Sequence, residues 1–466
     1  MNQEKDVTRR DFMKKSATVA ASSVALAAMG MPIIKPALGA NDKIRMGFIG
    51  LGNRGSQLLN LFMANPDVEI VALCDIYEPY LLRDRSKVDP RILKEIGGQV
   101  PKMGEVFAGK VDRYSDYHQV LDRKDIDAVC IATPDHWHAL QMIAAVDAGK
   151  DVYVEKPLTI TLHEGRKMVE AVKRTSRIVQ VGLNRRASPA YKELVKMMND
   201  GVIGKVSVAR AYRVNNMSPN GIGNAIAETP PQGFDWDMWL GPRAYRPFQY
   251  NIAPYKFRWW KDYSSQMGNW GVHYMDAIRW LMGEQAPVAI TARGGKVVLQ
   301  DDRDIPDTME VIFEMPSGAL IIFGIYEASG GETLPAGEVE LRGTKGNLYA
   351  NYTGYQIIPS RPGQFQSWKS LTEAVEKKQS VEQEPVANLQ ITGDLVRNFL
   401  DCIKSRQEPW CPIEEGHRST SFAHLANIAL EMKMRLEWDP VTERFTNSKK
   451  ANKLLHYQYR KPWQLV

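Results

Sequence analysis

The chain has 466 residues, of which 44% are hydrophobic and 24% charged, a composition typical of a soluble enzyme with two domains. About half of the formal net charge of +6 lies in the first 40 residues, and no stripe of Lys and Arg interleaved with aromatic residues follows, so nucleic acid is not an expected partner. No Cys or His pattern with zinc spacing occurs, so no metal site is expected.

The first 40 residues have the pattern of an export signal. Arg9 and Arg10 open the motif RRDFMK, and a weakly apolar run rich in Ala and Ser covers residues 17–31. A basic start followed by an apolar run is typical of a signal peptide, and the paired arginines resemble the twin-arginine signal, whose translocon carries folded proteins. An ordinary secretory signal or an uncleaved anchor is the alternative. We therefore expect a periplasmic protein.

A strand, a glycine loop and a helix follow in the order that a dinucleotide site requires. The apolar run at residues 44–49 leads into GLGNRG, which has G-x-G-x-x-G spacing, and then into an apolar helix face. A second strand, VEIVALCD, ends in an aspartate twenty residues after the last glycine. Glycines let backbone N–H groups approach a pyrophosphate, and the acid accepts the ribose hydroxyls. We predict a Rossmann nucleotide-binding domain, with cofactor contacts at Gly50, Gly52, Asn53, Arg54, Gly55 and Asp75.

The expected cofactor is NAD, with NADP as the alternative. The carboxylate of Asp75 would repel a 2′-phosphate, which favours NAD. Arg54 lies inside the glycine loop and leaves NADP open, since a guanidinium there could help to hold a phosphate.

Three further strand-like runs extend the same parallel sheet. They are AVCIATP at 128–134, DVYVEKP at 151–157 and IVQVG at 178–182. The carboxyl ends of parallel strands meet at one edge, where such sheets bind ligands. Residues that follow these strands are therefore expected around the dinucleotide: Thr133, Pro134, Asp135, His136, His138, Glu155, Lys156 and Asn184. The alternative for the two histidines is that they cap or pack within their loop.

After about residue 185 the alternation of strands and helices stops, and strand-like runs follow with hairpin signals such as MPSGAL and GTKGN. Two amphipathic helices at about 388–435 are expected to pack back on the first domain. The predicted fold class is α/β. It combines a doubly wound parallel Rossmann sheet over residues 41–184 with a C-terminal α/β domain over residues 185–466, which has an open, mostly antiparallel sheet.

The stretch PYKFRWWKDYSSQMGNWGVH is dense in aromatic residues, and two interpretations stay open for it. The rings form either a platform for a sugar, since aromatic faces stack on pyranose C–H groups, or part of the core. The residues concerned are Tyr255, Trp259, Trp260 and Trp270.

The four cysteines indicate little chemistry. Cys74 and Cys130 lie in apolar runs, where a buried side chain is expected. Cys402 and Cys411 either form a disulfide or stay free.

The motifs GFIGLGNRG, CIATPDHWHA, DVYVEKPLT and VQVGLNRR, followed by a Gly-x-His helix and a sheet domain, resemble the Gfo/Idh/MocA oxidoreductases over about residues 44–435. The resemblance implies a Rossmann domain beside an open-sheet domain used for oligomerisation, as a homodimer or homotetramer. It also implies NAD(P)-linked chemistry on sugars or polyols. Substrate contacts are then expected at Arg185, Trp259, Asn269, His273 and Asp276.

The resemblance also implies the catalytic residues. The family's E-K-P lysine falls on Lys156, as a general acid/base whose pKa burial lowers toward neutrality. Pro157 is expected to fix this loop, with a cis bond as one option. The family's histidine falls on His273, but the family's aspartate is Asn269 here. An amide orients a hydroxyl without supplying charge, so Asp276, one turn after His273, is the alternative carboxylate.

An exported Rossmann protein meets no soluble NAD pool, so it has to carry its cofactor and return it to its starting state in each cycle. The expected function is an exported, tightly NAD-bound oxidoreductase acting on a sugar, polyol or glycoside. The alternative is a redox-neutral glycosidase or lyase that uses catalytic NAD through a transient keto-sugar. Such enzymes form a sister branch of the family, with similar signals and glycine loops, but typically lack the lysine found at Lys156. A non-catalytic carbohydrate-binding protein is the third option.

Overall fold

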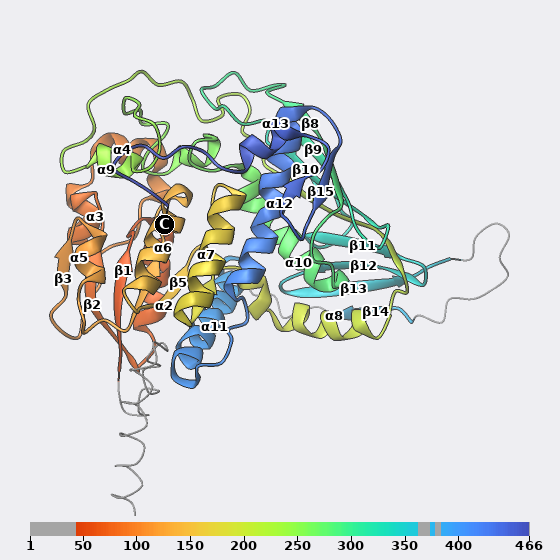
Figure 1. The fold of residues 1–466 in the computed structure, drawn as a ribbon, viewed down its shortest axis with the longest axis horizontal. Helices are drawn as coiled ribbons and strands as arrows, with labels where there is room; N and C mark the ends of the chain where they lie inside the picture. Colours follow the sequence, from red (N-terminus) through yellow and green to blue (C-terminus); the bar gives the residue numbers. More distant parts are fainter. Residues whose placement is uncertain (1–42, 362–372, 378–383, 466) are drawn as a thin grey trace, which may run out of the picture.

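The computed structural model describes residues 43–361, 373–377 and 384–465. The expected export signal at residues 1–40 lies outside this part of the chain. Two sheets dominate the fold, one in the left half of Figure 1 and one in the right half. Among the helices of the described residues, none has the length and apolar character needed to cross a bilayer.

The N-terminal sheet is parallel, with strand order β3-β2-β1-β4-β5-β6. Helices cover it on both faces, which is why its strands read as continuous apolar runs. The order reverses between β1 and β4, and such a switch point opens a crevice at the carboxyl ends of the strands. The predicted Rossmann sheet is confirmed. Its elements are β1 (Ile44–Ile49), α2 (Asn53–Met63), β2 (Val68–Cys74), α3 (Glu78–Leu82), α4 (Pro90–Ile96), β3 (Asp112–Tyr114), α5 (Tyr117–Leu121), β4 (Ala128–Ile131), α6 (His138–Asp147), β5 (Asp151–Val154), α7 (Leu162–Thr175) and β6 (Val179–Val181).

The second sheet follows the order β14-β13-β12-β11-β7-β10-β9-β8-β15-β16. It is antiparallel except where β7 and β10 pair in parallel, so the expected open, mostly antiparallel sheet is confirmed. Its strands are β7 (Val206–Val214), β8 (Ala289–Gly295), β9 (Thr308–Glu314), β10 (Leu320–Tyr326), β11 (Val339–Gly343), β12 (Gly346–Asn351), β13 (Gly354–Pro359), β14 (Val375–Lys377), β15 (Leu436–Asp439) and β16 (Arg444–Phe445). The helices α8 (Pro189–Asn199), α10 (Val272–Met282) and α12 (Ile413–Met432) pack on one face.

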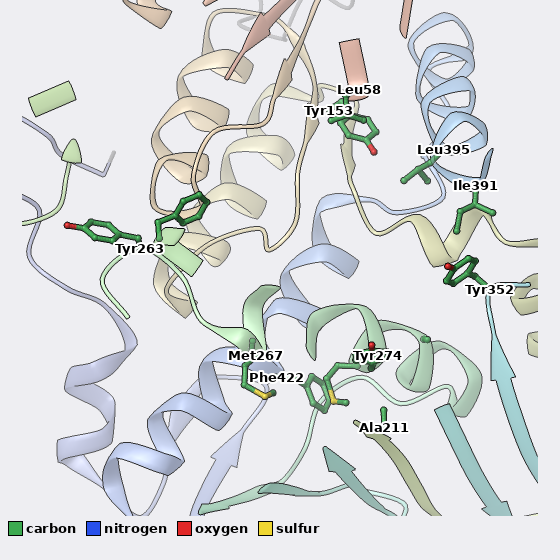
Figure 2. Close-up of a cluster of buried hydrophobic side chains, with 14 of the residues drawn as sticks. Leu58, Tyr153, Ala211, Tyr263, Met267, Tyr274, Tyr352, Ile391, Leu395 and Phe422 are labelled. Carbon is green, nitrogen blue, oxygen red and sulfur yellow. The ribbon is translucent and has the colours of Figure 1, made fainter. Parts of the chain in front are cut away.

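Two long helices join the domains. The helices α11 (Glu384–Ser405) and α12 stand between the two sheets in Figure 1. Arg397 of α11 pairs with Asp67 at 2.8 Å, and Arg406, just after it, pairs with Asp151 at 2.6 Å. Figure 2 shows Leu395 of α11 near Tyr153 of the Rossmann sheet, and one cluster of buried side chains continues from there into the second domain. The two domains therefore share a core.

All four cysteines are buried and unpaired. The sequence left open whether Cys402 and Cys411 form a disulfide, and in the structure both are free thiols. Burial raises the pKa of Cys411, so this thiol is a packing residue and not a reactive one.

Candidate active site

The loop between β1 and α2 contains three glycines with different physical roles. Gly50 has φ +88°, and a Cβ there would lie 2.7 Å from the backbone of Ala132. A Cβ on Gly55 would lie 2.0 Å from the carbonyl oxygen of Gly50. The protein's own packing requires these two glycines. Gly52 differs, because no residue other than its chain neighbours has an atom within 4 Å of the Cβ position there.

The space above Gly52 fits the pyrophosphate of a dinucleotide. Gly52 is the N-cap of α2, and the first turn of this helix carries no acidic side chain. Exposed amides and the helix dipole attract an anion at such an end, and a side chain at position 52 would block its approach. Gly52, Asn53 and Arg54 line a cleft of about 890 Å³, which continues to Thr133 and Pro134 after β4.

Asp75, after β2, lines the same cleft. Its carboxylate accepts hydrogen bonds from the backbone N–H groups of Leu51, at 2.6 Å, and Tyr77, at 2.9 Å. Burial raises its pKa, and these hydrogen bonds oppose that shift. A carboxylate has about four acceptor sites, so it can still bind ribose hydroxyls. Asp75 thus has the position and the free capacity expected of the residue that selects NAD.

In the sequence analysis Arg54 left NADP as an alternative cofactor, because its guanidinium could hold a phosphate. The structure gives this guanidinium another partner. Its Nε donates to Glu155 at 2.7 Å. Glu155 follows β5, three strands along the sheet from the β2 end that carries Asp75. The guanidinium is therefore paired, and it lies away from the position where a 2′-phosphate would meet Asp75.

A segment of the second domain forms one wall of the cleft, and sequence reasoning missed it. We call residues 233–258 the cover segment; it includes α9 (Trp236–Leu240), which lies beside α4 in Figure 1. The carbonyl of Gly233 accepts a hydrogen bond from Glu78 at 2.8 Å, and Lys256 pairs with Glu95 at 2.9 Å, so both ends are tied to the Rossmann domain. Its lining residues are Phe234, Met238, Trp239, Pro254, Tyr255, Phe257 and Arg258. The aromatic density of the sequence was the available signal.

Lys156 follows β5 and reaches across to the second domain. Its Nζ donates to the backbone carbonyl of Asn269 at 3.0 Å and lies 3.4 Å from the amide oxygen of the same residue. The Lys156–Pro157 peptide bond is cis, one of the options that the sequence left open. Burial lowers the pKa of Lys156 to about 8. A lysine with this pKa can take up and return a proton near neutral pH.

His273 lies in the first turn of α10, after the π-helical turn Met267–Gly271 that carries Asn269. Burial lowers the pKa of His273 well below its usual value, and the nearby cations Arg185 and Lys156 lower it further. The ring is therefore neutral. Its Nδ1 is buried without a hydrogen-bond partner among the described residues, and such atoms are rare in folded proteins. This nitrogen therefore has the capacity for one further hydrogen bond.

Two residues expected at the substrate are held elsewhere. Asp276 is fully buried and forms a bidentate ion pair with Arg186, with distances of 2.9–3.0 Å. Because this carboxylate is engaged by Arg186, the expectation that Asp276 replaces the family's aspartate is wrong. The guanidinium of Arg185 pairs with Glu338 at 2.7 Å. Arg185 therefore acts on the site through its positive charge near His273.

Several residues expected around the cofactor do not line the cleft, namely Gly55, Asp135, His136, His138, Glu155, Lys156 and Asn184. Both ring nitrogens of His138 are bonded to backbone carbonyls, those of Pro157 at 2.8 Å and Thr133 at 2.9 Å. The Nδ2 of Asn184 donates to Thr392 of α11 at 3.0 Å. Glu155 is buried and engaged by Arg54. The alternative for His136 is correct, because it packs under the cover segment and its Nε2 bonds the Trp239 carbonyl at 2.9 Å.

The aromatic residues do not form one platform. Trp260 is buried and donates to the carbonyl of Asn251 at 2.8 Å, which makes it a core residue. Trp259 donates to Glu327 at 2.8 Å and does not line the cofactor cleft, and its contact with a substrate stays a prediction. Trp270 stacks under Arg213 at 3.8 Å. Only Tyr255 of this group lines the cleft.

Comparison with known proteins agrees with this geometry. The family model described as "Oxidoreductase family, NAD-binding Rossmann fold" matches residues 44–183. The model described as "Oxidoreductase family, C-terminal alpha/beta domain" matches residues 189–465. The chain belongs to the Gfo/Idh/MocA oxidoreductase family. Its N-terminal domain is an NAD-binding Rossmann domain.

Relatives within the Gfo/Idh/MocA family fall into both of the chemical classes expected above. A glycosyl hydrolase family 109 protein of Saccharopolyspora erythraea is 32% identical over 38% of this chain and 37% of its own length. An inositol 2-dehydrogenase of Salmonella paratyphi B is 29% identical over 42% of this chain and 54% of its own length. The chain thus spans about a third to a half of these curated relatives.

Solved structures share the fold of this Gfo/Idh/MocA protein. A levoglucosan dehydrogenase in complex with NADH and L-sorbose aligns with a TM-score of 0.61 at 18% identity, covering 85% of this chain and 99% of that one. An NAD-binding oxidoreductase from Klebsiella pneumoniae aligns with a TM-score of 0.60 at 17% identity, covering 85% and 98%. At these identities the likeness shows the fold alone.

Proposed function

We propose that this protein is an exported NAD-dependent oxidoreductase acting on a hydroxyl group of a sugar, polyol or glycoside. The observation that carries the proposal is that Lys156 Nζ reaches Asn269 of the second domain, four residues before His273, whose buried Nδ1 has no hydrogen-bond partner among the described residues. Bound NAD supplies the acceptor for a hydride. Lys156, with a pKa of about 8, takes the hydroxyl proton, and the neutral imidazole of His273 orients the same hydroxyl.

The cover segment supports a cofactor that stays bound. It walls the cleft with aromatic residues and is tied to α3 and α4 of the Rossmann domain. We infer that this wall slows the release of the cofactor, which favours a reaction that restores it in place. A redox-neutral glycosidase with a transient keto-sugar meets this condition too, and it is the second candidate because a family 109 glycosyl hydrolase is among the relatives.

One experiment separates these candidates. The purified protein is denatured to identify the released nucleotide and its oxidation state, and the native protein is then mixed with a panel of sugars and glycosides while nicotinamide absorbance is followed. A ketosugar or lactone as product supports the dehydrogenase. A released aglycone without net NADH supports the glycosidase, and a protein that binds sugars without changing either nucleotide or sugar is a binding protein.

Export through the twin-arginine route is part of the proposal, supported by the RRDFMK motif and the apolar run after it. Changing Arg9 and Arg10 to Lys keeps the charge but removes the arginine pair, so the precursor is expected to stay in the cytoplasm. Immunoblots of cell fractions measure this. An unchanged periplasmic yield would exclude the twin-arginine route.

The outer face of the second sheet supports a homo-oligomer. One row of side chains across β9, β10, β7 and β11 consists of Ile312, Ile322, Arg210 and Glu340, and Ile312 is 38% exposed. A sheet face that combines apolar side chains with the Arg210–Glu340 ion pair is suited to a second copy. Changing Ile312 and Ile322 to Lys is expected to yield monomers in sedimentation velocity, whereas Val441→Lys, at an exposed turn, leaves the assembly unchanged. A wild type that sediments as a monomer would refute this.

A further inference from the structure

The cofactor cleft contains one positive charge that the protein itself does not neutralise. Of the described residues that line the cleft, only Arg54 and Arg258 are cationic, and Asp75 carries the only carboxylate. Arg54 forms an ion pair with Glu155, to which its Nε donates at 2.7 Å. Arg258 is the last residue of the cover segment, so it enters the cleft from the second domain.

Arg258 is held in place by contacts that leave its charge uncompensated. Its Nη1 donates to the backbone carbonyl of Tyr255 at 2.8 Å. Its Cζ lies 4.2 Å from the ring centre of Tyr255 and 4.4 Å from that of Phe257. Within the described ranges of the chain it forms no ion pair with a carboxylate.

The guanidinium of Arg258 still has hydrogen-bond donors to offer. A guanidinium has five N–H groups, and a ring stacked on its flat face leaves the donors in its plane free. Only one of these donors is bonded to the protein, and the side chain is half-buried rather than sealed in the core. The stacking fixes the position of the group, so little conformational entropy is lost when it binds a ligand.

The ligand that fits this cleft is an anion at its centre. The open Cβ position of Gly52 and the N-terminus of α2 fit the pyrophosphate of a dinucleotide. The helix end offers backbone N–H groups, while the cation of the glycine loop, Arg54, is already paired with Glu155. Guanidinium groups bind phosphate oxygens through short, charge-assisted hydrogen bonds.

We propose that Arg258 binds the pyrophosphate of NAD from the second domain and makes the cover segment part of the cofactor site. The amides of α2 then bind the phosphates from the Rossmann domain, and the guanidinium binds them from the other domain. Arg258 has this role whether the enzyme is a dehydrogenase or a glycosidase, since both classes need bound NAD. Its contact adds a step to cofactor release, so NAD is expected to dissociate faster without it.

The contact is tested by nucleotide binding, which needs no sugar. Calorimetric titration of the stripped protein measures the dissociation constants of ADP-ribose, which contains the pyrophosphate, and of adenosine, which lacks it. We expect Arg258→Met to weaken ADP-ribose binding by about 10- to 100-fold and to leave adenosine binding unchanged, because only the phosphates lose a partner. NAD⁺ and NADH are expected to lose the same factor, since both carry the pyrophosphate.

Two further variants separate a phosphate contact from a change in the shape of the cleft. Arg258→Lys keeps the charge but not the planar group, so it is expected to recover part of the affinity for ADP-ribose. Arg246→Met is the matched control. Arg246 belongs to the same cover segment and its Cζ lies 4.3 Å from the ring centre of Trp260, but it does not line the cleft. This control is expected to bind ADP-ribose like the wild type.

Melting temperatures measured without nucleotide show whether each variant is folded. Equal affinity for ADP-ribose in Arg258→Met and wild type would overturn the proposal, and a KM that then rises only for acidic sugars would assign Arg258 to a carboxylated substrate instead. An equal loss of affinity for adenosine and ADP-ribose would also overturn it, because Arg258 would then only shape the cleft. These outcomes do not depend on which sugar the enzyme accepts, so they leave the proposed function to its own test.

Discussion

Replacing Lys156 with Met is expected to slow the single-turnover reduction of bound NAD by about 10²–10⁴, with NAD content unchanged. Methionine keeps an unbranched stem of similar length but has no basic nitrogen, so the hydroxyl loses its proton acceptor. The Nζ of Lys156 contacts only Asn269 in the described structure, so its removal breaks no ion pair in the fold. Rapid mixing with a responsive sugar, followed by nicotinamide absorbance, measures the step.

The rate of the same step is expected to increase with pH. The amine acts as a base only when it is neutral, and burial lowers the pKa of Lys156 to about 8. Sugar oxidation is therefore expected to rise as the pH increases through about 8 and then to level off, whereas keto-sugar reduction falls over the same range. In Lys156→Met this dependence is expected to disappear.

A matched control is Lys167→Met in α7, which removes a partly exposed lysine that pairs with Glu170 of the same helix. It is expected to reduce NAD at the wild-type rate. If Lys156→Met does so as well with every responsive sugar, Lys156 is not the base.

Replacing Gly52 with Val is expected to weaken NAD binding by about 10- to 100-fold, the equivalent of 1–3 kcal/mol of steric conflict. Apart from Gly52 and its chain neighbours, no residue has an atom within 4 Å of the Cβ position of Gly52. The fold therefore tolerates a side chain there, and the conflict arises only with the pyrophosphate that approaches the N-terminus of α2.

Gly295→Val in β8 is the control for this change, since its Cβ position is equally open but lies in the second domain. The nucleotide released on denaturation and the NAD titration of the stripped protein are compared for both variants. Full NAD occupancy in Gly52→Val, at a normal melting temperature, would mean that this loop does not hold the pyrophosphate.

The Rossmann half of the fold could be predicted from local sequence patterns. The strand, glycine loop and helix at residues 44–63 are adjacent in sequence, and the loop's geometry depends on glycines within six residues of each other. The position of Lys156 also followed from sequence, because parallel strands bring their carboxyl ends to one edge. The second sheet was predictable in class but not in strand order, since its pairing joins distant strands such as β7 and β10.

The sequence by itself determined that Gly50, Gly52 and Asp75 lie at the crevice, and it predicts Lys156 and His273 as the catalytic residues. Only the tertiary structure decided which polar side chains are free to act there. Asp276 forms an ion pair with Arg186, ninety residues away, and both ring nitrogens of His138 are bonded to backbone carbonyls of its own domain. The cover segment reaches the cleft from the other domain. Hydrogen-bond partners come from any segment that the fold brings near, so a residue's availability is a property of the packed molecule and not of its local pattern.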